Sequence, residues 1–192
     1  MKLAIDAYYY DDKAKVVGIL FTDWKDSEPV EIISEYLTDI ADYESGSFYK
    51  RELPCIMELL RKIDLSKVEI IIVDSFVYLD DNQKLGLGGY LYQSLEERIP
   101  VIGVAKNSFH GNNKNVLEIF RGDSKKPLYI SSIGIDLDES AILIHSMHGD
   151  YRFPTLLRLL DTRTKDWSGF AKVKTKTLVL FGGLQKLISC HL

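Results

Sequence analysis

The sequence predicts a single-domain α/β protein in which a mixed β-sheet carries helices on its faces. Three strand-like segments come first, and helical and strand-like segments then alternate, a pattern typical of mixed sheets. The chain has 192 residues, of which 46% are hydrophobic. This is enough for one domain with a substantial core, and no internal repeat or low-complexity linker divides it.

The first part of the chain predicts a group of three strands. Residues 2–10 and 15–24 are strand-like, and the polar turn Asp11-Asp12-Lys13 between them indicates a hairpin. Residues 29–37 have an interrupted apolar pattern that is compatible with a third strand. Residues 38–50 are polar and irregular, so we expect a connection there.

Helices and strands alternate from about residue 50 onwards. Residues 67–74 are rich in β-branched side chains and predict a strand, residues 84–97 predict a helix with three early glycines, and residues 99–105 predict a short buried strand. An amphipathic helix is predicted over 50–63, where apolar residues recur at helical spacing. These residues are Leu53, Ile56, Met57, Leu60 and Ile63.

The last third of the chain predicts two more strands and two helices. The strands flank the turn Gly122-Asp123-Ser124, and Asp136 or Asp138 is expected to cap the first helix, because Asp accepts hydrogen bonds from first-turn N–H groups. The predicted ranges are 115–121 and 127–133 for these strands, 139–148 and 154–164 for the helices, and 177–191 for a last strand, a Gly182-Gly183 break and an apolar tail.

Composition favours a reducing cytoplasmic location without a membrane span. No apolar run approaches the roughly 18 residues that a span requires, and Asp6 comes too early for a secretory signal. The two cysteines, Cys55 and Cys190, have no metal-like spacing. The sequence does not indicate an oligomeric state.

The charge distribution places any phosphate-facing surface in the second half of the chain. The net charge of −4 argues against avid nucleic-acid binding, which depends on neutralising phosphates with Lys and Arg. Acidic residues concentrate in residues 1–82, however, and basic residues become denser after Lys106. The simpler interpretation of both regions is a set of solvated surfaces.

Four carboxylates lie where strands or helices are expected to begin or end. Asp6 follows Leu3-Ala4-Ile5, Asp74 follows an apolar strand, Glu52 opens a helix, and Asp161 follows Leu156–Leu160. Acids at the carboxyl ends of buried strands face the rim of the sheet, where open α/β folds bind their ligands. Such a group suits Mg²⁺, which prefers oxygen ligands and retains waters for substrate phosphates. The sequence therefore suggests metal-assisted phosphodiester cleavage.

Six sequence blocks in order resemble the endonuclease V family. The string Pro100-Val101-Ile102-Gly103-Val104-Ala105-Lys106 is similar to the family signature P-T-I-G-V-A-K. The other blocks, which together span roughly residues 3–163, are Ile5-Asp6-Ala7-Tyr8, Phe48-Tyr49-Lys50-Arg51-Glu52, Val73-Asp74, Tyr129–Gly134 with Leu137–Ala141, and Tyr151-Arg152-Phe153-Pro154 with Arg158, Leu159 and Asp161.

The resemblance implies a ribonuclease H-like fold with helices on both faces of the sheet. It implies an endonuclease V-like domain over 1–166 with a C-terminal extension over 167–192. It also implies Mg²⁺-dependent cleavage beside deaminated purines, a DNA-repair reaction, with Mn²⁺ as a possible substitute. The matched metal ligands would be Asp6, Glu52 and Asp74, completed by Asp161 as a catalytic residue, and Lys106 would reach the substrate.

Several departures concern the parts of the family that read the substrate. The family loop D-G-x-G-x-x-H-P-R is replaced by Asp74–Asn82, which lacks the small residues, the His and the Arg. The P-Y-I-P wedge is replaced by Asp42–Ser47, and Ile135 stands in place of a family histidine. A flipped base needs a close-fitting pocket, which Phe76 would fill. Gly86 and its neighbours could rebuild a close-approach surface, and His110 could face the substrate.

These observations favour a metal-dependent endonuclease with altered recognition of DNA or RNA, and single-stranded nucleic acid is the better candidate substrate. Two alternatives stay open. A member of the fold that no longer cleaves could bind nucleic acid or protein, which the acidic loop and negative net charge would suit. A small-molecule phosphoesterase could use the same metal site.

Overall fold

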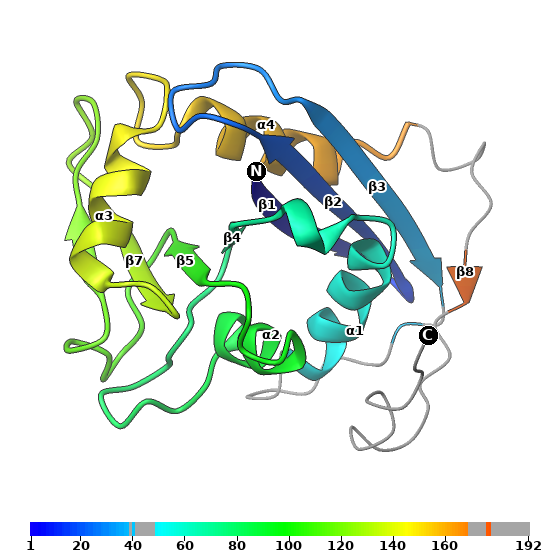
Figure 1. Ribbon diagram of the computed structural model, residues 1–192, viewed down its shortest axis with the longest axis horizontal. Coiled ribbons are helices and arrows are strands. Elements are labelled where there is room, and N and C mark those ends of the chain that lie inside the picture. The colour runs from blue at the N-terminus through cyan, green and yellow to red at the C-terminus, as the bar shows by residue number, and fades with distance from the viewer. Residues whose placement is uncertain (39, 41–48, 169–175, 178–192) are drawn as a thin grey trace.

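The computed structural model describes residues 1–38, 40, 49–168 and 176–177 and shows one mixed sheet with helices on both faces (Figure 1). The sheet has eight strands in the order β6-β7-β5-β4-β1-β2-β3-β8. The strands are β1 (Lys2–Tyr10), β2 (Lys13–Phe21), β3 (Glu31–Thr38), β4 (Ile70–Val73), β5 (Val101–Ala105), β6 (Leu117–Ile119), β7 (Leu128–Ile133) and β8 (Lys176–Thr177).

Strand β1 lies near the middle of the sheet and joins its two halves. On one side β1, β2 and β3 form an antiparallel meander, with Asp6 opposite Val17. On the other side β4 and β5 run parallel to β1, and Ile5 pairs with Val73. The predicted hairpin is confirmed: Tyr10 pairs with Lys13 across a two-residue turn in which Asp11 has φ +54°.

Two hydrophobic cores lie on opposite faces of the sheet. Successive side chains of a strand point to opposite faces, so Leu3 and Ile5 pack under α1 (Tyr49–Leu60) and α2 (Leu87–Ser94). Ala4 faces the other core, which is covered by α3 (Leu137–Ser146) and α4 (Thr155–Lys165). Figure 1 shows the two helix pairs on either side of the sheet. The predicted mixed sheet with helices on both faces is thus confirmed, and it is consistent with a ribonuclease H-like fold.

The helices and strands are mostly shorter than the sequence predicts. The strand predicted from residue 67 begins at Ile70, because Leu65–Lys67 form a 3₁₀ turn capped by Asp64. Helix α2 ends at Ser94, before Glu96 and Glu97, which both have positive φ. Asp136 is the cap of α3, since its side chain accepts from Glu139 N at 3.0 Å.

Parts of the predicted connection and of the C-terminal extension lie outside the described residues. These are 39, 41–48, 169–175 and 178–192, which include the segment that replaces the family wedge, and Cys190. Of the predicted last strand, the structure describes β8, which pairs in parallel with Leu37 and Thr38. Within the described part of the chain, no helix combines the length and apolarity that crossing a membrane requires.

Candidate metal centre

The register of β1 and β4 brings Asp6 and Asp74 together. Ile5 and Val73 are partners in the parallel ladder, so the acids that follow them leave the same point of neighbouring strands. Asp74 lies directly after β4, as predicted. Asp6 does not lie at the end of its strand, which is a correction, because β1 continues to Tyr10 by pairing with β2. It lies where the parallel pairing ends, which places it at the same rim.

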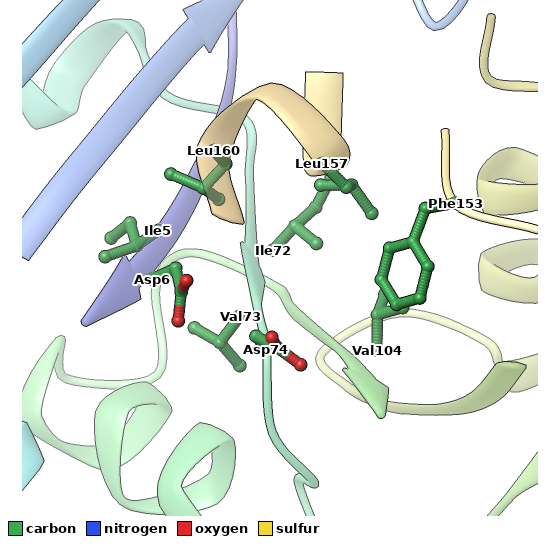
Figure 2. A pocket seen from close by; sticks show the side chains of 9 residues that line it. All are labelled: Ile5, Asp6, Ile72, Val73, Asp74, Val104, Phe153, Leu157 and Leu160. Carbon is green, nitrogen blue, oxygen red and sulfur yellow. The ribbon is translucent and has the colours of Figure 1, made fainter. Parts of the chain in front are cut away.

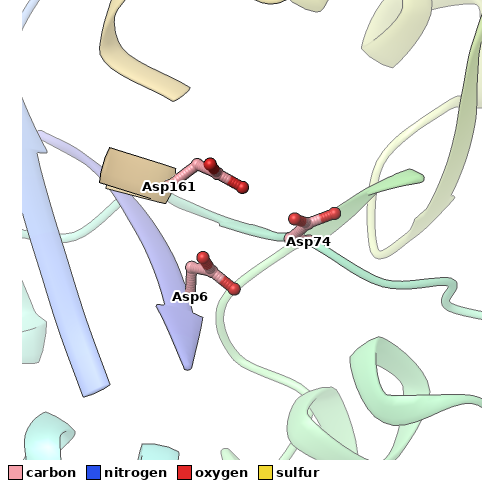
Figure 3. A group of neighbouring side chains, drawn as sticks. All are labelled: Asp6, Asp74 and Asp161. Carbon is pink, nitrogen blue, oxygen red and sulfur yellow. The ribbon is translucent and has the colours of Figure 1, made fainter. Parts of the chain in front are cut away.

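Helix α4 contributes the third acid, Asp161. The helix packs against β1 and β2 and turns Asp161 toward the two strand acids, as Figure 3 shows. One carboxylate oxygen from each of Asp6, Asp74 and Asp161 lies within 4.8 Å of the other two. We call these residues the three-acid group. Asp161 lies within α4 and not after its end, so it is a helix-borne acid.

Two lysines neutralise part of the charge of the three-acid group. Lys106 Nζ donates to Asp74 Oδ2 and to Asp161 Oδ1, each at 2.8 Å, and Lys165 Nζ donates to Asp161 Oδ2 at 2.7 Å. Partial burial favours the protonated form of Asp161, but these hydrogen bonds outweigh that effect and hold the pKa of Asp161 below its ordinary value. Burial also disfavours the charged form of Lys106, but the two carboxylates that accept its hydrogen bonds raise the pKa of Lys106 above its ordinary value.

The negative charge of Asp6 is less well compensated by neighbouring groups than that of Asp161. Burial and the nearby charge of Asp74 raise the pKa of Asp6 to about 6, against the opposing effects of hydrogen bonds. These bonds come from Thr164 Oγ1 to Asp6 Oδ2 at 3.0 Å and from Ala7 N to Asp6 Oδ1 at 2.8 Å. A cation beside Asp6 would favour its ionised form.

Glu52 lies on the other side of Asp6 and Asp74, in the first turn of α1. Its side chain is buried, with the residue only 7% exposed, and it lines a small pocket together with both strand acids. Burial, followed by the charges of Asp6 and Asp74, raises the pKa of Glu52 to about 9. Glu52 does not belong to the three-acid group, but the structure brings it beside two of its members.

A second pocket opens between the strand acids and α4. Figure 2 shows Asp6 and Asp74 at one end of an otherwise apolar lining, with Leu157 and Leu160 above and Phe153 at the side. Lys106 Nζ lies 5.2 Å from the centre of the Phe153 ring. This apolar wall lies beside Asp6, which is partly buried, whereas Asp74 is exposed at the rim.

Comparison with known proteins identifies the family. The family model described as Endonuclease V matches residues 3–123, more than half of the chain. The chain belongs to the endonuclease V family. The match covers Asp6, Glu52, Asp74 and Lys106 but ends before Asp161, whose place in the site rests on the geometry described above. No curated protein sequence matches the chain.

Solved endonuclease V structures share the fold. The Bacillus subtilis protein has a TM-score of 0.72 at 23% identity, over 89% of this chain and 81% of that one. The catalytic domain of human endonuclease V has a TM-score of 0.69 at 21% identity, over 89% and 83%. Ciona intestinalis endonuclease V, in complex with a DNA that contains an inosine followed by a ribo-adenosine, has a TM-score of 0.69 at 15% identity, over 90% and 86%.

The loop that follows Asp74 is tightly packed. Phe76 is 8% exposed and Val77 is fully buried, and Val77 N donates to Ser131 Oγ at 2.9 Å. Gly86 is buried behind this loop: a Cβ there would lie 2.4 Å from the Phe76 carbonyl oxygen, so packing alone requires glycine. His110 is exposed on the loop after β5. A substrate contact of either residue stays a prediction.

Sequence reasoning missed two residues that shape the site. Thr164 follows Asp161 by three positions and therefore shares its side of α4, a spacing that could have identified it. Arg152 donates to the carbonyl oxygens of Lys106 and Pro127 and so fixes the backbone at Lys106. Its place in the Tyr151–Pro154 block was visible, but its partners depend on the tertiary fold.

Proposed function

We propose that this protein is a Mg²⁺-dependent endonuclease that hydrolyses phosphodiester bonds in DNA or RNA and leaves a 3′-hydroxyl and a 5′-phosphate. The convergence of Asp6, Asp74 and Asp161 on one point at the rim of the sheet is the observation that carries this proposal. Membership of the endonuclease V family supports it, and so does the DNA in the complex of the Ciona relative. We further propose a cytoplasmic location, where the buried thiol of Cys55 stays unpaired.

The residues present fit a divalent metal ion. The donors are carboxylate oxygens, which Mg²⁺ prefers and Mn²⁺ also accepts, and the mutual repulsion of Asp6 and Asp74 would be relieved by a cation between them. Glu52 would orient this set from the α1 side. When bound, a divalent ion supplies an activated water and stabilises the leaving oxygen of an in-line displacement.

The protein's own residues would place the phosphate and control protons. Lys106 extends from the end of β5 to the three-acid group, so its ammonium can pair with a phosphate oxygen at the same place. Thr164 holds the Asp6 carboxylate in a fixed orientation. Glu52 is protonated at neutral pH as long as no cation lowers its pKa, so it can hold a proton beside the site.

We propose that the substrate is single-stranded and that inosine brings little or no preference. A flipped base requires a close-fitting pocket, whereas the buried side chains of Phe76 and Val77 fill the loop after Asp74. Gly86 leaves room for the backbone of this packed loop, because a Cβ there would meet the Phe76 carbonyl oxygen. His110 is exposed, so it can contact a single-stranded nucleic acid. The DNA bound to the Ciona relative contains an inosine, and this chain would differ from that relative in base recognition.

A cleavage panel tests the proposal. Single- and double-stranded DNA and RNA, with and without inosine, are incubated with Mg²⁺, Mn²⁺ or EDTA at low salt. We expect metal-dependent cleavage of single strands by the wild type and a loss of at least about 100-fold in Asp6→Asn and Asp74→Asn, by analogy with the loss of one electrostatic stabiliser. Asp123→Asn, which removes an exposed turn acid, is the matched control.

Equal cleavage by the wild type and both site variants would remove the metal assignment. If the wild type binds oligonucleotides and metal by calorimetry but cuts nothing, the chain is a binding module that has lost its activity. Turnover of a chromogenic phosphodiester without cleavage of any oligonucleotide would instead indicate a small-molecule phosphoesterase.

A further inference from the structure

An exposed tyrosine stands on the loop before α4, the helix that carries Asp161. Tyr151 is 64% exposed and lies between α3 and α4. Beneath it, Arg121 is only 5% exposed and donates to four backbone carbonyl oxygens of this region. The acceptors are His145 at 3.2 Å, Gly149 at 2.9 Å, Tyr151 at 2.9 Å, and Met147.

Close backbone packing holds the same loop from the other side. Gly122 has φ +55°, and a Cβ at this position would lie 1.9 Å from the Asp150 carbonyl oxygen. The turn that contains Gly122 therefore packs directly against the residue before Tyr151. A buried cation with four carbonyl partners and a backbone contact of this kind fix the Tyr151 backbone, so a ligand could stack on the ring at little entropic cost.

Arg158 completes a surface with Tyr151. Its guanidinium carbon lies 4.9 Å from the centre of the Tyr151 ring. On α4, Arg158 precedes Asp161 by three residues, which corresponds to about 5–6 Å between Cβ atoms. Arg158 and Asp161 therefore share one side of α4.

The other end of the loop leads into the site itself. Arg152, next to Tyr151, donates to the Lys106 carbonyl oxygen, and Phe153 lines the pocket beside Asp6 and Asp74. Tyr151 and Arg158 thus lie on the α4 side of the three-acid group. Arg158 adds a positive charge there, in a chain whose net charge is negative.

We propose that Tyr151 and Arg158 bind one unpaired nucleotide next to the scissile phosphate of a single-stranded nucleic acid. The ring stacks on the base, and the planar guanidinium pairs with the adjoining phosphate. Stacking of this kind tolerates any base, and it needs a base that is free of its own pairing and stacking. The inference rests on the proposed nuclease function and specifies how that site holds its substrate.

Binding measured apart from cleavage tests this site. Fluorescence anisotropy with labelled single-stranded DNA and RNA oligonucleotides is recorded in EDTA for the wild type, Tyr151→Leu, Tyr151→Phe, Arg158→Gln and Arg98→Gln. We expect Tyr151→Leu and Arg158→Gln to weaken binding at least about fivefold, the lower end for loss of one stacked base. Tyr151→Phe keeps the stacking ring and Arg98→Gln removes an exposed arginine just before β5, at the opposite rim, so both should bind as the wild type does.

Three outcomes would overturn the proposal: unchanged binding in Tyr151→Leu, an equal loss in Tyr151→Phe, or no single-strand binding by the wild type. Cleavage in Mg²⁺ is measured in parallel, and we expect Tyr151→Leu to raise KM with little change in kcat. If the wild type cuts but Tyr151→Leu binds normally, only this inference fails. If the binding differences appear but nothing is cut, only the nuclease proposal fails. Thermal unfolding confirms that each variant is folded.

Discussion

At the scale of single residues, part of the negative charge of the three-acid group is balanced by lysine contacts that a metal ion would replace. Lys106 bridges Asp74 and Asp161, and Lys165 pairs with Asp161 alone. A divalent ion at the three-acid group would compete with Lys106 for the same oxygens. Under the proposed function, Lys106 would therefore have two separable effects, one on metal affinity and one on the reacting phosphate.

Replacement of Lys106 by Met should separate these effects. We expect Lys106→Met to lose at least about 100-fold in cleavage, because it removes a positive charge aimed at the phosphate. Mn²⁺ affinity, measured by calorimetry, should stay equal or increase because the competing ammonium is gone. Lys165→Met, which removes a partner of Asp161 only, should reduce cleavage much less. A parallel loss of metal affinity and cleavage in Lys106→Met would contradict this account.

The raised pKa of Glu52 predicts a pH dependence of stability in the absence of metal. The ordinary value is 4.5 and the folded value is about 9, so the folded protein binds a proton that the unfolded chain releases in this range. The stabilisation is complete below pH 4.5 and is lost as the pH rises toward 9, by at most about 1.4 kcal/mol per pH unit.

Glu52→Gln cannot ionise and provides the reference for this measurement. Urea unfolding in EDTA between pH 5 and 9 should show the free energy of unfolding of the wild type falling relative to Glu52→Gln. Asp6, whose pKa is raised to about 6, is present in both proteins, so most of its smaller effect cancels in the difference. Two parallel stability curves would show that Glu52 is not held protonated by the fold.

At the scale of elements, the position of α4 decides whether Asp161 and Thr164 reach the strand acids. The end of this helix is held by Lys15, a buried residue of β2 whose ammonium donates to the carbonyl oxygens of Arg163, at 2.5 Å, and Asp166. The last carbonyls of a helix have no partner within it, and a cation suits their negative end. Lys15 thus fixes α4 against the sheet on which Asp6 lies.

We predict that Lys15→Met destabilises the protein by about 2 kcal/mol, the magnitude expected for hydrogen bonds to a charged group. Metal affinity should also fall, because α4 would hold Asp161 and Thr164 less firmly. Urea unfolding and Mn²⁺ calorimetry measure the two effects. The control is Lys25→Met, which changes an exposed lysine in the turn after β2. An unchanged stability in Lys15→Met would show that helix packing alone positions α4.

At the scale of the whole molecule, the negative net charge limits how strongly phosphates can be attracted. Lys106 and Lys165 pair with members of the three-acid group, and Arg158 lies beside Tyr151, whereas the whole chain has 24 Lys and Arg against 28 Asp and Glu. Association with nucleic acid should therefore depend on a small local set of charges and on stacking.

The salt dependence of binding measures this number of charges. For single strands the slope of log K against log salt is about −0.7 per neutralised phosphate, so two to three contacts predict a slope of roughly −1.4 to −2. Anisotropy titrations of a single-stranded oligonucleotide in EDTA between 25 and 200 mM salt give the slope. A value much steeper than this range would reveal a broader basic surface than the structure indicates.

Much of the fold was predictable because it is encoded in short-range patterns. The β-branched run before Asp74, the helical spacing of Leu53 and Ile56, and the capping position of Asp136 each depend on neighbours along the chain. The element boundaries were less accurate: the positive φ at Glu96 and Glu97 that ends α2 early, for instance, has no clear signal in the sequence.

The sequence by itself determined the order of the elements, the two faces of the sheet, and the acids available to bind a metal, since periodicity and residue type are local properties. The tertiary structure alone decided that Asp6 lies where the parallel pairing of β1 with β4 ends, that Thr164 contacts an acid 158 positions away, and that Lys106 joins two acids from different elements. It also decided how deeply Glu52 is buried, and hence its pKa. Distances between remote residues and the exclusion of water arise only when the sheet and helices pack together.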